Sequence, residues 1–237
     1  MFRSLLAIVL LFVAVPAHAK KMVYSPVVHE GEKEIEYYLD WRENSAGTDV
    51  VGHEIAFEYG YAPKDMMALY LVYEDVSGTA VEFVKYKVEW VHQLFEQGER
   101  AWDVGTYLEY QVRDDPAKAD KIEFKPLFEK HLSPFVVTIN GVFEKEIGEN
   151  ATGGTELGYA ARVAWRKHRR LVPALEAFGS LGEISDFTPA DMQSHIVGPV
   201  VDVEISRFVR WQAGALFGVT DGSEDVRVKS NLAWEWY

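Results

Sequence analysis

The sequence contains no cysteine. In an exported protein this excludes a disulfide framework and thiol chemistry, so stability must come from packing and strand pairing. Beyond residue 19 no apolar run approaches the roughly 18 residues that a membrane helix needs, which argues against helical membrane spans. Basic residues are also scarce, with Lys+Arg 24 against Asp+Glu 37 and a formal net charge of −13. This acidic balance argues against nucleic acid as a partner.

Short catalytic and metal-binding motifs are missing as well. The histidines are scattered, and no His-x-x-x-His or His-Glu-x-x-His spacing occurs, so the sequence predicts no metal site. There is no Gly-x-Ser-x-Gly elbow, and Gly153-Gly154 lacks the lysine of a phosphate loop. Asp191, Ser194 and His195 lie close in sequence, but this proximity does not make a catalytic triad. We therefore predict no catalytic residue, no cofactor and no enzyme activity.

The N-terminus has the features of a secretory signal. Arg3 supplies the positive start, Leu5–Val15 is an apolar run, and Ala17-His18-Ala19 is a small-x-small cleavage pattern. The run is short for a membrane span, and Pro16 with the cleavage pattern favours removal over an uncleaved anchor. We expect a signal peptide over residues 1–19 and a single mature domain over residues 20–237.

Alternation of apolar and polar residues dominates the rest of the chain. In the last stretch, Val226, Val228, Leu232, Trp234 and Trp236 form an apolar row, and the residues between them are mostly polar. A period of two is typical of a β-strand with one apolar and one wet face. The pattern predicts about twelve strands separated by turn residues. The predicted strands are Glu34–Trp41, Val51–Tyr61, Met67–Tyr73, Val81–Val91, Trp102–Arg113, Ile122–Phe128, Phe135–Phe143, Leu157–Trp165, Leu171–Leu181, Ile196–Ile205, Val209–Val219 and Val226–Tyr237.

An all-β chain of this kind has two possible architectures. The apolar rows could face lipid, or they could face the core of a soluble sandwich. The signal peptide, the even strand number and the terminal aromatic strand favour an antiparallel transmembrane β-barrel, in which the last strand pairs with the first. Aromatic residues form 14% of the sequence. Such residues make the interfacial girdles of membrane barrels.

In a barrel, the polar rows line the lumen. We predict a lumen lined by Glu54, Glu58, Lys85, Lys87, Glu109, Arg162, Arg166, Asp202, Glu204, Arg210, Arg227 and Lys229. Nearly balanced charges of this kind would cross-link neighbouring strands and narrow the interior, which favours a selective or closed pore over a wide porin. The acidic excess predicts a preference for cations in any pore.

Arg166-Lys167-His168-Arg169-Arg170 is the one basic run in the chain. Its simplest interpretation is a hairpin turn with a polar flank. The alternative is a contact with an anion, such as the phosphates of lipopolysaccharide or an anionic substrate.

Three motifs in the C-terminal third carry a resemblance to a known group of proteins. They are Ala177-Phe-Gly-Ser-Leu-Gly-Glu183, Gln193-Ser-His-Ile-Val-Gly-Pro199 and Gly214-Ala-Leu-Phe-Gly-Val-Thr-Asp-Gly-Ser223. With the terminal aromatic strand, they resemble a widespread group of uncharacterised Gram-negative outer-membrane β-barrels. The resemblance covers residues 177–237 well and the earlier part in outline. It implies the fold and the outer-membrane location, and no catalytic residue. The final Tyr237 stands where this group usually has Phe.

Two functions remain open at this point. The first is an outer-membrane channel or passive transporter for a small solute. The second is a barrel without transport, serving as an envelope scaffold or partner-binding protein; an outer-membrane lipid-modifying enzyme is a distant third. The expected partners are outer-membrane lipid, lipopolysaccharide and the barrel-assembly machinery, which reads the terminal aromatic strand as the resemblance implies.

Overall fold

A computed structural model describes residues 20–43, 49–76 and 78–237. The predicted signal peptide over residues 1–19 lies outside the described residues, as does most of the loop after the first strand. Among the residues described, no helix has the length and hydropathy needed to cross a bilayer.

The strands lie where the alternation predicts them. Their bounds are β1 Lys33–Glu43, β2 Asp49–Ala62, β3 Asp65–Val76, β4 Glu82–Gln93, β5 Asp103–Arg113, β6 Asp120–Leu132, β7 Phe135–Ile147, β8 Thr155–Trp165, β9 Leu171–Glu183, β10 Asp186–Phe187, β11 Ser194–Glu204, β12 Val209–Gly218 and β13 Val226–Trp236. Only β10 was not predicted; it is a two-residue strand paired with the end of β9. The remaining strands form a closed antiparallel barrel of twelve strands, which confirms the predicted fold.

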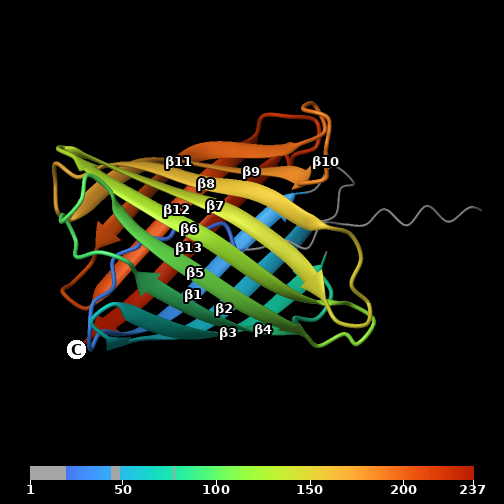
Figure 1. Cartoon of the computed structure of the whole chain (residues 1–237), viewed down its shortest axis with the longest axis horizontal. Helices are drawn as coiled ribbons and strands as arrows, with labels where there is room; N and C mark the ends of the chain where they lie inside the picture. The colour runs from blue at the N-terminus through green and yellow to red at the C-terminus, as the bar shows by residue number, and fades with distance from the viewer. Residues whose placement is uncertain (1–19, 44–48, 77) are drawn as a thin grey trace, which may run out of the picture.

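The first and last long strands close the barrel. β1 pairs with β13 along its whole length, from Lys33 opposite Trp236 to Glu43 opposite Val226. Every other long strand pairs with its neighbours in the chain, apart from the short β10. The strands run obliquely across the barrel in Figure 1, as closure requires. We call the end where β1 begins and β13 ends the proximal end, and the opposite end the distal end.

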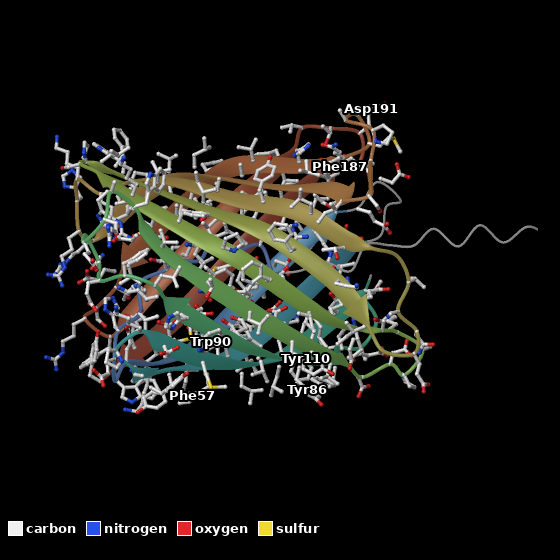
Figure 2. The ribbon with its side chains drawn as sticks, viewed as in Figure 1. Phe57, Tyr86, Trp90, Tyr110, Phe187 and Asp191 are labelled. Atoms are coloured by element: carbon white, nitrogen blue, oxygen red, sulfur yellow. The ribbon has the colours of Figure 1, made fainter. Side chains whose placement is uncertain are left out.

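The two faces of each strand differ as the alternation predicts. Ile55, Phe57, Leu69, Leu175 and Leu232 are exposed on the outer surface. Figure 2 shows Phe57, Tyr86 and Tyr110 projecting away from the barrel wall. A closed barrel leaves no unpaired strand edge, so an apolar outer surface of this kind fits the hydrocarbon of a bilayer.

The residues before β1 lie inside the barrel, which the sequence did not predict. We call residues 20–32 the N-terminal segment. The Tyr24 backbone N–H donates to Asn140 Oδ1 of β7 at 2.8 Å, and Val28 N–H donates to Gln93 Oε1 of β4 at 2.9 Å. Further along, Gly31 N–H donates to the Gly60 carbonyl of β2 at 2.7 Å. The segment therefore crosses the lumen and contacts the wall on several strands.

Candidate functional site: the lumen

The structure places the predicted lumen residues on the inner face, mostly in ion pairs. Lys87 Nζ lies 2.9 Å from Glu54, and Lys85 Nζ donates to Gln111 at 2.6 Å. Arg227 lies 2.9 Å from Asp40. The remaining predicted lumen residues have these partners in the structure: Glu58 with Tyr70, Glu109 with Lys87 and Tyr107, Arg162 with Glu176 and Asp202, Glu204 with Arg169, Arg210 with Glu34 and Glu235, and Lys229 with Glu176.

Arg166 lies apart from these pairs. It follows β8 in the turn that the basic run forms, is exposed, and lines the proximal part of the lumen. Within the same turn, Arg169 Nε lies 3.2 Å from Glu204 at an exposed position. The basic run Arg166–Arg170 therefore forms the turn between β8 and β9, which is the simpler of its two interpretations from the sequence.

The pairing register brings inward glutamates of successive strands directly opposite one another. We call this set the glutamate row. Following the hydrogen-bonded register from strand to strand, it consists of Glu235, Glu34, Glu58, Glu89, Glu109, Glu123, Glu144, Glu156 and Glu183, with Ala68 of β3 as the one interruption between Glu58 and Glu89. Glu235, Glu34, Glu58, Glu89, Glu109 and Glu123 lie within predicted strands, whereas Glu144, Glu156 and Glu183 lie just beyond the predicted bounds of theirs. The sequence did not show that these glutamates share one register.

The glutamate row runs from one end of the barrel to the other. Glu235 and Glu34 lie at the proximal ends of β13 and β1, whereas Glu156 and Glu183 lie at the distal ends of β8 and β9. Because the strands are tilted, register partners on successive strands rise along the barrel axis. The row is therefore an acidic spiral on the wall that links the two ends of the lumen.

Like charges directly opposite on neighbouring strands destabilise a sheet. Here lysines and hydroxyls from the adjacent inward positions offset the repulsion. Lys87 Nζ lies 3.5 Å from Glu109 and 3.6 Å from Glu89, and Lys125 Nζ lies 2.6 Å from Glu123. Lys121 pairs with Glu144, Tyr70 O–H donates to Glu58, and Tyr107 O–H donates to Glu109 at 2.6 Å.

Glu89 is the exception in the row. It is 0% exposed, and neither of its carboxylate oxygens has a hydrogen-bond partner among the described residues. Its nearest cation is the Lys87 ammonium, and Glu109 stands opposite it in the register. A buried carboxylate without a hydrogen bond is costly, so Glu89 depends on the Lys87 ammonium for its compensation.

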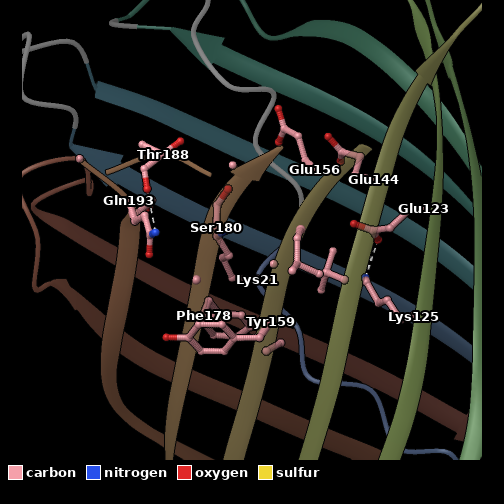
Figure 3. Close-up of a pocket in the computed structure, with 18 of the residues that line it drawn as sticks. Lys21, Glu123, Lys125, Glu144, Glu156, Tyr159, Phe178, Ser180, Thr188 and Gln193 are labelled. Carbon is pink, nitrogen blue, oxygen red and sulfur yellow. Dashed lines mark hydrogen bonds and ion pairs between the residues drawn. The ribbon is translucent and has the colours of Figure 1, made fainter. Parts of the chain in front are cut away.

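Two cavities lined by the N-terminal segment lie in the described part of the lumen. The distal cavity, of about 360 Å³, is lined by Lys20, Lys21 and Met22 of the segment and by Glu123, Glu144 and Glu156 of the row. Figure 3 shows these three glutamates on neighbouring strands facing this cavity.

The proximal cavity, of about 340 Å³, is lined by the segment from Met22 to His29 and by Glu34 and Glu58. Between the two cavities, the Tyr24 ring lies 4.6 Å from the ring of Tyr107, whose hydroxyl holds Glu109. The glutamate row thus opens into both cavities, and the segment covers its middle.

The wall formed by β8, β9, β11 and β12 has a different character. Its inner face carries small and apolar side chains, and Ala160, Phe178, Ile196, Val200 and Leu216 form a buried cluster against which Val23 packs. A few charges bridge this side. Arg162 lies 2.7 Å from Glu176, and Lys229 of β13 lies 2.5 Å from the same carboxylate.

Among the described residues, three groups of side chains near the proximal end could hold a cation. Each brings ligand atoms within 4.8 Å of one another: Asp103, Glu129 and His131; Glu32, Glu34 and Glu235; and Glu34, Glu36 and Glu58. The sequence spacing did not predict them, because their members come from different strands or from the N-terminal segment. In the first group, Gly98 N–H and the Thr138 hydroxyl already donate to Asp103 and Glu129. We therefore assign no metal to these groups.

The residues near His195 do not converge as a catalytic group. The His195 ring lies beside Tyr159, whose hydroxyl lies 3.1 Å from Nδ1, and its Nε2 lies 3.0 Å from Gln193. Both rings cross over Gly179, where a Cβ would meet Tyr159 and His195 at 2.2 and 2.6 Å. His195 and the adjacent Ser194 point to opposite faces of β11, and Ser194 lines the distal cavity.

Comparisons with known proteins agree with the barrel. No family model matches the sequence, and no curated protein matches it. An outer membrane channel from Pseudomonas putida F1 superposes with a TM-score of 0.65 and 9% identity, over 93% of this chain and 100% of that one. The KdgM porin superposes with a TM-score of 0.61 and 5% identity, over 86% of this chain and 99% of that one. The Acinetobacter baumannii outer membrane protein Omp33 superposes with a TM-score of 0.50 and 12% identity, over 87% of this chain and 99% of that one.

At these identities the likeness concerns the fold. The fold is that of Gram-negative outer-membrane β-barrels, which confirms the resemblance seen in the C-terminal third. With its apolar outer surface and closed sheet, such a barrel belongs in the outer membrane, as predicted.

Proposed function

We propose that this barrel is a narrow outer-membrane channel for small cationic solutes. The observation that carries the proposal is the glutamate row, which reaches from the distal cavity to the proximal cavity along the wall. Rings and rows of carboxylates are a common basis of cation selectivity, because they offset the cost of removing water from a cation. No catalytic role is part of the proposal. Outer-membrane lipid and lipopolysaccharide would surround the barrel, and the assembly machinery would insert it.

Conduction in this proposal depends on the N-terminal segment. The backbone of Tyr24 makes two hydrogen bonds with Asn140, and that of Val28 makes one with Gln93; these bonds help hold the segment across the lumen. The segment has no strand or helix of its own, so its displacement breaks no sheet pairing. A partial displacement would join the two cavities along the row and leave the wall intact.

The filled lumen also supports a second candidate function, a barrel that binds a partner or serves as a scaffold without transport. Planar bilayer recordings separate the two. A channel requires single-channel steps from the purified, heat-modifiable protein, with a larger conductance after residues 20–30 are deleted. Each protein is first shown to be folded by its different gel migration with and without boiling. If neither folded protein then conducts, the scaffold function is supported and the channel is contradicted.

Selectivity tests the role of the row itself. In a KCl gradient we expect the reversal potential to lie closer to the equilibrium potential of K⁺ than to that of Cl⁻. Replacing Glu58 and Glu144 together by glutamine should lower the ratio of cation to anion permeability several-fold. The control is Glu99→Gln, an exposed position in the β4–β5 connection, which should leave the ratio unchanged. Anion selectivity of the unmodified protein, or an equal effect of the control, would contradict the proposal.

A further inference from the structure

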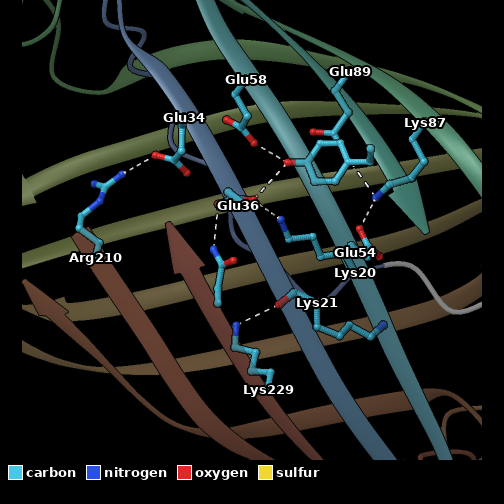
Figure 4. Close-up of polar contacts among 12 residues, drawn as sticks. Lys20, Lys21, Glu34, Glu36, Glu54, Glu58, Lys87, Glu89, Arg210 and Lys229 are labelled. Atoms are coloured by element: carbon cyan, nitrogen blue, oxygen red, sulfur yellow. Dashed lines mark hydrogen bonds and ion pairs between the residues drawn. The ribbon is translucent and has the colours of Figure 1, made fainter. Parts of the chain in front are cut away.

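The N-terminal segment places one lysine side chain in a buried seat of the lumen wall. Lys20 Nζ donates to Glu36 Oε2 at 2.6 Å, and both side chains are nearly inaccessible. The same ammonium lies over two aromatic rings, 4.8 Å from the centroid of Tyr70 and 5.2 Å from that of Tyr38. Figure 4 shows Lys20 reaching among the carboxylates of this part of the wall.

The surroundings of this seat favour a charged amine. Burial disfavours the ammonium ion, but the carboxylates of Glu36, Glu54, Glu58 and Glu89 outweigh it and raise the pKa of Lys20 above its ordinary value. Aromatic faces attract an ammonium through their electron density and cannot replace the oxygen ligands of a small metal ion. A carboxylate with two tyrosine rings therefore matches a primary ammonium better than an inorganic cation.

The lumen repeats the same recognition unit. Lys87 lies 4.5 Å from the Tyr70 ring and 2.9 Å from Glu54. Lys125 lies 4.3 Å from the Tyr107 ring and 2.6 Å from Glu123. In each unit an ammonium is held by at least one glutamate and at least one tyrosine face. Lys87 and Lys125 belong to wall strands, whereas Lys20 comes from a segment outside the barrel sheet, so Lys20 is the occupant that can leave.

The seat also lies at the boundary between the cavities. Lys20 lines the distal cavity, and its partners Glu36 and Tyr70 line the proximal cavity. A solute that entered from either side would meet the seat on its path, beside Glu58 of the glutamate row, which shares the Tyr70 hydroxyl.

We propose that the Lys20 seat is a binding subsite for primary alkylammonium ions, and that Lys20 is a tethered competitor for it. This inference rests on the proposed channel function and deepens it, because it names small primary amines and diamines as the solute class. Glu36 accepts the hydrogen bond of the ammonium, and Tyr38 and Tyr70 enclose it. The solute displaces Lys20 and thereby loosens the segment that covers the row.

The test uses chemical rescue of the full chain in detergent. Lys20→Ala removes the side chain beyond Cβ, for which n-propylammonium is the matching free ion. We expect the unfolding midpoint, followed by tryptophan fluorescence, to rise by several degrees with n-propylammonium chloride relative to equal sodium chloride. Tetramethylammonium, which cannot donate a hydrogen bond to Glu36, should give no such rise.

Two matched variants isolate the seat. Lys20→Met fills the seat with an uncharged chain of similar length, and Lys20→Ala with Glu36→Gln removes the acceptor; neither should respond to n-propylammonium. Equal responses of all variants, or no response of Lys20→Ala, would overturn the assignment of the seat.

A flux measurement on the unmodified protein keeps the inference testable even when Lys20→Ala fails to fold. Reversal potentials should show a higher permeability for n-propylammonium than for tetramethylammonium, and this preference should be lost in Lys20→Met, whose uncharged side chain fills the seat. If the unmodified protein conducts without this preference, the proposed solute class is contradicted, whereas the channel function is still supported. If n-propylammonium stabilises Lys20→Ala but no protein conducts in any salt, the binding subsite is supported and the proposed channel function is contradicted.

Discussion

The two sides of the lumen use charge in different ways. On β1–β7, carboxylates stand opposite carboxylates, and Lys87 faces three of them, Glu54, Glu89 and Glu109. On β8, β9, β11 and β12, single charges bridge a wall of small and apolar residues. Glu176 there is met by Arg162 and Lys229.

This difference determines how strongly the loss of one charged side chain affects stability on each side of the lumen. Where many partners share the charge, the loss of one carboxylate leaves the others paired and relieves repulsion. Where a few charges are matched among buried apolar residues, as at Glu176, removal of one cation leaves the carboxylate with less compensation. We therefore expect the acidic side to determine selectivity, and the small-residue side to determine how firmly the barrel is held.

The largest stability effect should come from the bridge on the small-residue side. Lys229 and Glu176 are each 1% exposed and 2.5 Å apart. Lys229→Met should lower the free energy of unfolding by about 3–5 kcal/mol, because it leaves a buried carboxylate with one cation fewer. Urea unfolding in lipid or detergent measures the change. The double variant Lys229→Met with Glu176→Leu should recover much of the loss, and equal losses in both proteins would refute the bridge.

A smaller loss should follow from a cavity on the same side. Leu216 is 0% exposed and packs in the cluster with Phe178 and Val200. Leu216→Ala should cost about 2–4 kcal/mol by the usual sum of lost transfer energy and residual cavity. Leu232→Ala, at a position that is 45% exposed on the outer face, is the matched control and should cost clearly less in detergent. Similar midpoints for the two variants would mean that the cluster does not stabilise the barrel.

The smallest effect should come from the middle of the glutamate row. Glu89→Gln removes a buried charge that lacks a hydrogen bond and faces Glu109. We expect unfolding free energy to change by no more than about 1 kcal/mol, and toward higher stability, because repulsion between opposed carboxylates is relieved. The same urea titration applies. A loss as large as that of Lys229→Met would erase the distinction between the two sides.

The barrel could be predicted from the sequence because its signal is local. In each strand, alternation of the kind seen from Val226 to Trp236 sets which residues face lipid and which face inward, and turn residues set the strand ends. The inward position of residues such as Glu109 and Arg162 follows from the same pattern without any knowledge of their neighbours.

The glutamate row and the N-terminal segment could not be predicted in this way. The row depends on register across many hairpins, and a shift of two residues in one hairpin would place Glu109 opposite a different partner while leaving the alternation unchanged. The segment from Lys20 to Glu32 has no periodic pattern, so nothing local assigns it to the lumen. One available clue was that Lys20-Lys21 stands immediately before a strongly acidic set of inward strands.

The position of the N-terminal segment in the chain has a consequence for the order of assembly. The carbonyl of Lys21 accepts a hydrogen bond of 2.9 Å from Lys229 of β13, which follows the N-terminal segment by about 200 residues along the chain. The contents of the barrel are thus made before its wall, and the final seam between β1 and β13 closes around material that is already present. The last strand along the described chain therefore both closes the wall against β1 and holds the segment that precedes β1.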